Sequence, residues 1–291
     1  MRAGRDLLHN PDRNMTVMPS VSRIRLTLQA LLLSAHPGPS LAVTVLSILL
    51  AIGAGLPPAT IVVLGAAIAL GQLTIGWVND LIDSDRDKSA GRTDKPVAAG
   101  LLSIRMVWMA LVIAAVGCVG LSALLGWRSA SVHLLLLVGG GQVYNIWLKS
   151  TVWSWLPYLV AFGSLPSIVD LAGPTAKLAP WWMTVTAAVL GVAAHLLNAL
   201  GDLDIDARTG VRGLPHRLGA TWTTRLAVLL LGLGSAVVAF GPAGGVRVWS
   251  WPLLAAIVVL LVIASRGKGR RPFQAAILIA ILDAVMLVIS A

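Results

Sequence analysis

One pattern of polar residues occurs twice in this chain, with the copies 119 residues apart. Both copies read N-x3-D-x3-D-x3-G-x4-P-x3-G, and each follows a long apolar run. A spacing of four places the Asn and both Asp residues on one face of a helix. Crowded carboxylates repel one another unless a cation neutralises them, so two such faces predict a site for divalent cations such as Mg²⁺. The first copy is Asn79, Asp83, Asp87, Gly91, Pro96 and Gly100, and the second is Asn198, Asp202, Asp206, Gly210, Pro215 and Gly219.

Basic residues follow the carboxylates in both copies. Arg92 and Lys95 come after the acids of the first copy, and Arg212 comes after those of the second. A third polar patch, YNIWLKS, contributes Tyr144, Asn145 and Lys149. Mg²⁺ is usually held by a few carboxylates plus substrate phosphates, while Arg and Lys bind phosphate oxygens directly. The combination predicts a diphosphate ligand, and an apolar membrane cavity beside it would suit an isoprenyl tail.

The composition is that of a polytopic membrane protein. Of the 291 residues, 57% are hydrophobic and 12% are charged, whereas soluble domains carry about 25% charged residues. The net charge of +10 does not indicate nucleic acid, because cytoplasmic loops of membrane proteins are enriched in Lys and Arg. All twelve acidic residues are Asp, and their concentration in the two repeated segments argues against a random scatter of surface charge. Eight lie there: Asp80, Asp83, Asp85, Asp87, Asp94, Asp202, Asp204 and Asp206.

Nine apolar runs predict an all-α fold of nine transmembrane helices, because a bilayer core requires about 20 residues per helix. With a cytoplasmic N-terminus, nineteen of the 22 basic residues fall on the cytoplasmic side. The positive-inside rule therefore predicts that the N-terminus and both Asp motifs are cytoplasmic and the C-terminus is outside. Residues 1–35 are expected to be a basic tail that can include a surface-lying helix, and residues 36–291 the membrane domain. The runs are 38–56, 59–78, 105–125, 131–148, 153–171, 181–200, 225–241, 249–265 and 273–290.

The 119-residue offset predicts two related halves, with spans one to four and five to eight in the same orientation. Paired repeats commonly build one site where they meet, so both Asp faces are expected to point into a shared central cavity. Other titratable residues receive plainer interpretations. Asp80 lacks a counterpart because the second copy carries Ala199, Asp85 and Asp204 are expected in solvent, His195 is expected to pack or line the cavity, and Asp170 and Asp283 are given no role.

These motifs resemble those of the UbiA superfamily of intramembrane prenyltransferases. NDLIDSDRD at 79–87 and DLDID at 202–206 are similar to the two Asp-rich motifs of that family. GRTDKP at 91–96 and YNIWLKS at 144–150 resemble its basic stretch and its Tyr and Lys after the fourth helix. The resemblance covers about residues 35–290, and it implies a nine-helix membrane fold.

The resemblance also implies a role for each candidate residue. Asn198 would support the second cluster, and Tyr144 would face the reacting carbon. The allylic C–O bond would ionise, the cations would stabilise charge on the leaving diphosphate, and a dry cavity would keep water from the carbocation until an acceptor attacks. Two Mg²⁺ ions would be held by Asn79, Asp83, Asp87, Asp202 and Asp206, and the diphosphate by Arg92, Lys95 and Lys149.

Several alternatives remain open at this level. Many members of the family carry Arg-Pro where this chain has His36-Pro37, which disfavours a carboxylated aromatic acceptor such as hydroxybenzoate. Quinone precursors, chlorophyll-like or haem acceptors, and lipid or sugar phosphates fit equally well. The same Asp clusters would serve a membrane terpene cyclase, which needs no acceptor. A cation transporter is disfavoured by the nearby Arg and Lys, and a CDP-alcohol phosphotransferase by the missing D-G-x-x-A-R opening.

Overall fold

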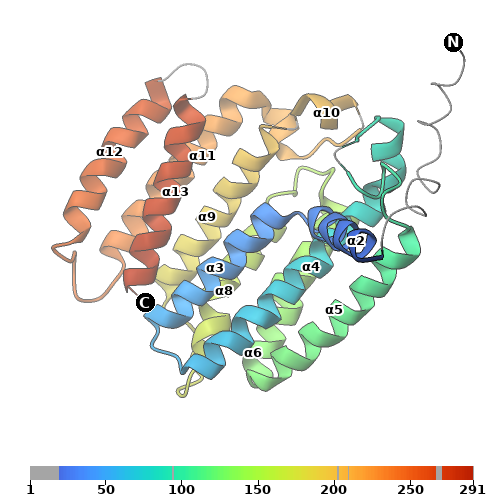
Figure 1. Ribbon diagram of the computed structural model, residues 1–291. Coiled ribbons are helices and arrows are strands. Elements are labelled where there is room, and N and C mark those ends of the chain that lie inside the picture. Colours follow the sequence, from blue (N-terminus) through green and yellow to red (C-terminus); the bar gives the residue numbers. More distant parts are fainter. Residues whose placement is uncertain (1–19, 94, 202, 209, 267–270, 291) are drawn as a thin grey trace, which may run out of the picture.

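The computed structural model describes residues 20–93, 95–201, 203–208, 210–266 and 271–290, and all regular structure within them is helical (Figure 1). This confirms the predicted all-α membrane fold for the described part of the chain. The helices are α2 (Ser20–Ser34), α3 (Pro37–Gly53), α4 (Pro58–Ser89), α5 (Ile104–Leu124), α6 (Trp127–Val132), η2 (His133–Val138), α7 (Gly139–Val143), η3 (Tyr144–Leu148), α8 (Leu156–Ala172), α9 (Trp181–Ala199), α10 (Leu203–Arg208), α11 (Leu214–Phe240), α12 (Ser250–Arg266) and α13 (Arg271–Ser290).

Within the described ranges, six helices are long and apolar enough to cross a bilayer. They are α4, α5, the continuous helix Trp127–Leu148, α9, α11 and α13. The pair α2 and α3 meets the same criterion together but bends by 74° at its break, and α8 and α12 are shorter apolar helices. Each of the predicted apolar runs overlaps one of these elements.

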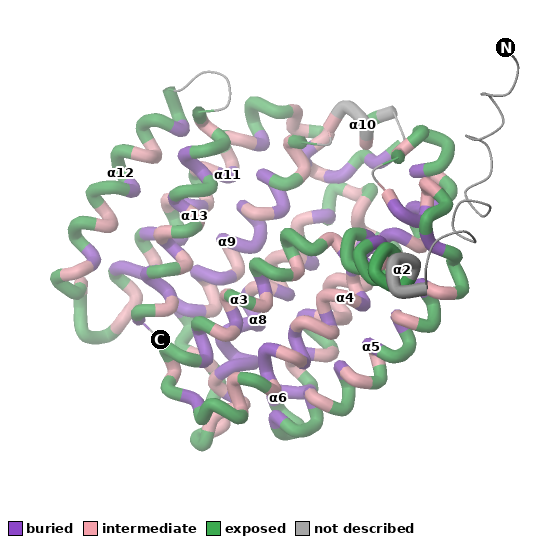
Figure 2. The backbone as a smooth tube through the Cα atoms, in the orientation of Figure 1, coloured by how far each residue is buried: buried purple, intermediate pink, exposed green. Residues whose placement is uncertain are grey.

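The long helices close into a ring (Figure 1). Neighbouring helices pack in chain order from α3 through α4, α5, α6, α8, α9 and α11 to α13, and α13 returns to pack on α3. Figure 2 shows that α8 and α9 bury much of their surface while α5 and α12 expose theirs. Large apolar side chains such as Val62, Ile113 and Leu229 are exposed on the outside, as expected of helices that face lipid.

The first Asp motif lies on a helix that continues beyond the predicted span. At 32 residues, α4 is about 48 Å long, which exceeds a hydrocarbon core of about 30 Å. Its last three turns carry Asn79, Asp83 and Asp87, and both carboxylates are buried. The predicted common helical face is therefore confirmed for the first copy.

The second copy does not form such a face, and the prediction is wrong there. Helix α9 ends at Ala199 and α10 begins at Leu203, so Asn198 and Asp206 lie on different helices. Gly201 stands in the break, where the first copy has Ile82. Glycine is about 1 kcal/mol less favourable than alanine inside a helix, which helps to explain why the chain turns here and not in α4.

The same turn follows both motifs despite this difference. Gly91 and Gly210 have left-handed φ values of 68° and 84°. The amide of the next residue donates a hydrogen bond to the carbonyl of the motif's last Asp, at 3.0 Å for Asp87 and 2.9 Å for Asp206. A left-handed residue with this bond is a common helix C-terminus, and it explains the glycine shared by the two copies.

Candidate active site

The carboxylates of the first motif are buried, and Asp83 is paired with two basic side chains. Asp83 accepts a hydrogen bond from the Lys149 ammonium at the end of η3, and Arg86 pairs with it at 2.6 Å from one turn along α4. Asp87 is also buried, on the next turn. Buried charge is tolerated only when it is paired, so Lys149, predicted as a diphosphate ligand, here holds the carboxylate face of α4.

Two asparagines join η3 to α4 beside this pair. The Asn79 side-chain amide donates to Asn145 Oδ1 at 3.0 Å, and Asn145 Nδ2 donates to the Ile75 carbonyl at 2.9 Å. The η3 segment is π-helical, a geometry that often marks functional sites. The sequence places Asn145 in the third polar patch with Tyr144 and Lys149 but assigns it no role, and the structure shows that it ties η3 to α4.

Lys95 lies beside the same motif, next to Asp80. Its ammonium lies 2.9 Å from His36 Nε2 and 3.4 Å from Asp80 Oδ1. Asp80 is buried, and neither of its oxygens accepts a well-formed hydrogen bond from any described residue. Burial, together with the positive charges of Lys95 and Lys149, lowers the pKa of His36 to about 4, so the imidazole is neutral at physiological pH.

A small apolar cluster fixes the loop that carries Lys95. Val97 and Leu102 are buried in this loop and pack with Trp77 of α4 and Val107 of α5. Arg92, the other basic residue predicted here, lies half-buried in the turn after α4. This packing anchors the loop that carries Lys95 to α4 and α5.

The second motif is more open. Asp206, whose side chain is 21% exposed, lies 3.3 Å from His216 Nε2 on α11. Asn198 is exposed at the end of α9, and Arg212 is exposed before α11, where its carbonyl accepts a 3.2 Å hydrogen bond from Arg217 Nε. Asp202 lies outside the described residues. The predicted roles of these residues remain predictions.

Tyr144 is the first residue of η3 and belongs to an aromatic cluster. Its ring meets Tyr158 edge-on at 5.1 Å, and Tyr158 stacks on His195 at 4.5 Å. Aromatic faces stabilise nearby cations, which suits this position for a carbocation.

The acidic residues fit a magnesium site that a diphosphate completes. Among the described residues, no three His, Cys or Asp side chains lie close enough to enclose a metal ion by themselves. Mg²⁺ usually takes only one or two carboxylates plus phosphate oxygens and water. Asp83 and Asp87 supply two buried carboxylates one helical turn apart, which matches that donor set.

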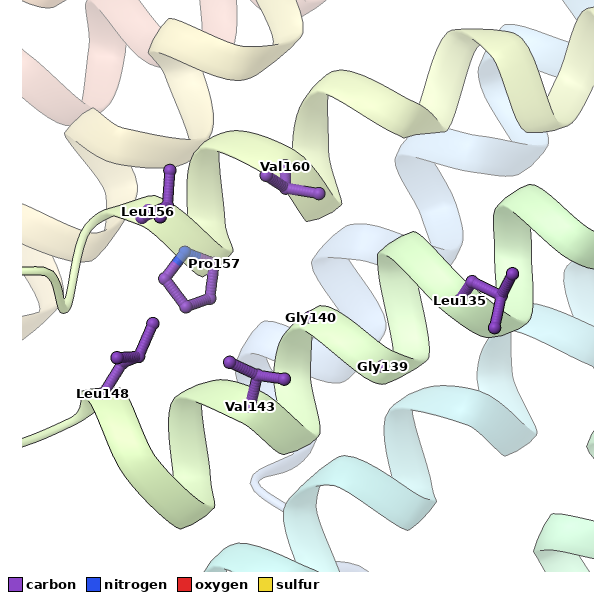
Figure 3. A pocket seen from close by; sticks show the side chains of 8 residues that line it. All are labelled: Leu135, Gly139, Gly140, Val143, Leu148, Leu156, Pro157 and Val160. Carbon is purple, nitrogen blue, oxygen red and sulfur yellow. The ribbon is translucent and has the colours of Figure 1, made fainter.

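An apolar groove of about 260 Å³ lies apart from the carboxylates, between α8 and the helix that ends in η3 (Figure 3). Its lining includes Leu135, Val143, Leu148 and Val160 and contains no charged or polar side chain. Figure 3 shows these side chains pointing toward the space between the two helices. Such a groove suits a hydrocarbon chain and has no means of binding diphosphate.

Comparison with known proteins places the chain in a family. The model of the UbiA prenyltransferase family matches residues 40–282, and the chain belongs to this family. It is 29% identical over 219 residues to the bacteriochlorophyll synthase 33 kDa chain of Cereibacter sphaeroides, covering 70% of this chain and 68% of that one. It is 30% identical over 191 residues to protoheme IX farnesyltransferase of Roseiflexus castenholzii, covering 62% of this chain but only 34% of that protein.

Solved structures share the fold. A UbiA homologue from Aeropyrum pernix superposes with a TM-score of 0.67 at 17% identity, covering 84% of this chain and 97% of that one. A UbiA homologue from Archaeoglobus fulgidus bound to GPP and Mg²⁺ gives 0.64 at 16% identity, covering 90% and 100%. The family-model match confirms the predicted family, and these structures show that the fold is shared.

Proposed function

We propose that this protein transfers an isoprenyl group from a polyprenyl diphosphate to a lipophilic acceptor in the membrane, with Mg²⁺ as cofactor and with release of diphosphate. The observation that carries the proposal is the buried carboxylate face of α4, with Lys149 of the η3 segment paired to Asp83. The Archaeoglobus homologue bound to GPP and Mg²⁺ supports the same ligand chemistry.

In this reaction the residues of the chain would bind Mg²⁺ and the diphosphate and would shield the allylic carbocation. Asp83, Asp87, Asp202 and Asp206, with Asn79, would hold two Mg²⁺ ions, which supply positive charge that lowers the barrier to losing diphosphate. Lys149, Lys95, Arg92 and Arg212 would donate hydrogen bonds to the diphosphate oxygens as negative charge builds on them. Asn198 would support the second cluster. Tyr144, together with Tyr158, would present a ring face to the allylic carbocation until the acceptor captures it.

The membrane arrangement is part of the proposal. The proposed nine spans would be α3, α4, α5, the helix Trp127–Leu148, α8, α9, α11, α12 and α13, in two halves of four with α13 added; within the described residues, six of these helices are long and apolar enough by themselves. The distribution of Lys and Arg favours a cytoplasmic N-terminus and an external C-terminus, with both Asp motifs on the cytoplasmic side. The relatives named for protoheme and bacteriochlorophyll keep a large ring acceptor among the candidates, beside quinone precursors and lipids.

Product analysis tests the proposal. Purified protein with Mg²⁺ is given geranyl, farnesyl or geranylgeranyl diphosphate, alone and with host lipid extract, and the products are identified by mass spectrometry. Consumption that requires the extract, with an acceptor gaining the mass of one prenyl group, is the expected result. A cyclic hydrocarbon or terpene alcohol formed without acceptor would identify a membrane terpene cyclase. No consumption in any mixture would refute both activities.

A further inference from the structure

The connection between α2 and α3 is built into the polar cluster of the first motif. We call residues 34–36 the elbow. Its His36 has left-handed backbone angles, φ 52° and ψ 65°. Histidine enters this region more readily than most residues, but a non-glycine residue stays there only where its surroundings hold it.

The elbow is held by direct packing on α4. A Cβ added to Gly76 would lie 2.3 Å from the Ala35 carbonyl oxygen, so only glycine permits this approach of two backbones. The next residue, Trp77, donates from its indole N–H to the Leu31 carbonyl at 2.9 Å. Ser40 Oγ, from α3, donates to the Ala35 carbonyl at 3.0 Å.

This docking brings His36 to Lys95 and Asp80. The Lys95 ammonium has three N–H donors. One of them is directed to His36 Nε2 at 2.9 Å, and the Asp80 carboxylate forms an ion pair with the ammonium at 3.4 Å. The remaining donors are left for a phosphate oxygen. The second copy of the motif has Ala199 and Leu214 where the first has Asp80 and Lys95, so it offers no such arrangement.

We propose that His36 and Asp80 are positioning residues that hold the Lys95 ammonium beside the first Asp motif for the diphosphate, and that the docking of the elbow on Gly76 sets the place of His36. The part of this proposal that concerns diphosphate rests on the proposed function. The part that concerns the position of Lys95 is independent of it, because it can be tested in substrate-free protein.

The first experiment measures how fast an amine-acylating reagent labels Lys95 and Lys149 in substrate-free protein, by peptide mass spectrometry. Both side chains are largely shielded, at 15% and 16% exposed. Removing one charge-assisted hydrogen bond in His36→Ala is expected to speed labelling of Lys95 about tenfold and to leave Lys149 within about twofold. Equal acceleration at both lysines would show general loosening, and no change at Lys95 would show that His36 does not hold it. Either result overturns the proposal.

Two further variants separate the imidazole from the elbow. His36→Asn should restore slow labelling, because asparagine tolerates left-handed angles and its carbonyl accepts a hydrogen bond from Lys95. Gly76→Ala should reproduce the His36→Ala result with His36 and Lys95 both present. Gly120→Ala, on α5 with open space around the new Cβ, is the matched control and should change nothing. Wild-type labelling in Gly76→Ala would refute the role of the docking.

Kinetics then tests the link to diphosphate. His36→Ala and Asp80→Asn are expected to raise KM for the isoprenyl diphosphate about tenfold, with kcat changed less than threefold. A loss confined to kcat would contradict a role in holding Lys95 for substrate binding. If wild-type protein consumes no isoprenyl diphosphate, the proposed function fails, while the labelling result still decides whether His36 positions Lys95.

Discussion

The two Asp motifs share their sequence pattern and the turn that follows it, but they differ in helix continuity, burial and basic partners. In the first, one unbroken helix buries two carboxylates, and basic side chains from three places reach that face. In the second, the helix breaks, and Asp206 is partly exposed beside His216. The residues equivalent to Arg86 and Lys95 are the apolar Ile205 and Leu214. The comparison suggests that the first motif handles both metal and diphosphate, while the second contributes mainly metal ligands.

The largest expected effects come from removing one carboxylate in each motif, and the two variants should differ in thermal stability. Asp83→Ala and Asp206→Ala should each lower turnover about a thousandfold, since both remove charge that acts on the transition state. Only Asp83→Ala should also lower the melting temperature clearly, because it leaves Lys149 and Arg86 without their partner in a buried place. Activity assays and thermal unfolding in detergent measure the two effects. Full activity in Asp83→Ala would sink the metal-site interpretation.

The next largest losses of activity are expected when the residue paired with an Asp is replaced in each motif. Lys149→Met should reduce kcat/KM about a hundredfold, because it removes a donor to the developing charge and one of the two basic partners of Asp83. His216→Ala should cost less than about tenfold, because Asp206 already has solvent access. Initial rates at saturating Mg²⁺ test the pair. Equal losses would mean that both motifs meet the diphosphate in the same way.

The two motif asparagines should differ more modestly. Asn79→Ala breaks the hydrogen bond to Asn145 that ties η3 to α4, and a loss of about tenfold in turnover is expected. Asn198 is exposed, and Asn198→Ala should stay within about threefold of wild type. Raising the Mg²⁺ concentration provides the control, since a lost metal ligand is rescued by excess metal. A severe, Mg²⁺-rescued defect in Asn198→Ala would restore it to the predicted metal-supporting role.

The smallest effect tests the helix break itself. Gly201→Ala adds about 1 kcal/mol of helix propensity between α9 and α10. Turnover should fall by about two- to fivefold if the break sets the position of Asp206. Gly120→Ala serves again as the control. Unchanged Mg²⁺ dependence and rate in Gly201→Ala would show that the break does not matter for the site.

Much of this protein is determined by short stretches of sequence. Composition decides the membrane class, apolar runs predict the helices, and the spacing of four in an uninterrupted helix places Asn79, Asp83 and Asp87 together. The shared Gly91 and Gly210 predict the same turn, because left-handed backbone angles are a local property of glycine. In each case the cause acts within a few residues, so the sequence is sufficient.

The contacts that complete the site were decided only by the tertiary structure. Lys95 meets His36 across 59 residues, Asn79 meets Asn145 across 66, and Lys149 meets Asp83 across 66. The departure of the second copy from a single helix depends on the balance between weak helix propensity at Gly201 and the packing of α10 and α11. Such pairings follow from how whole helices pack against one another, and no periodicity within either segment carries that information.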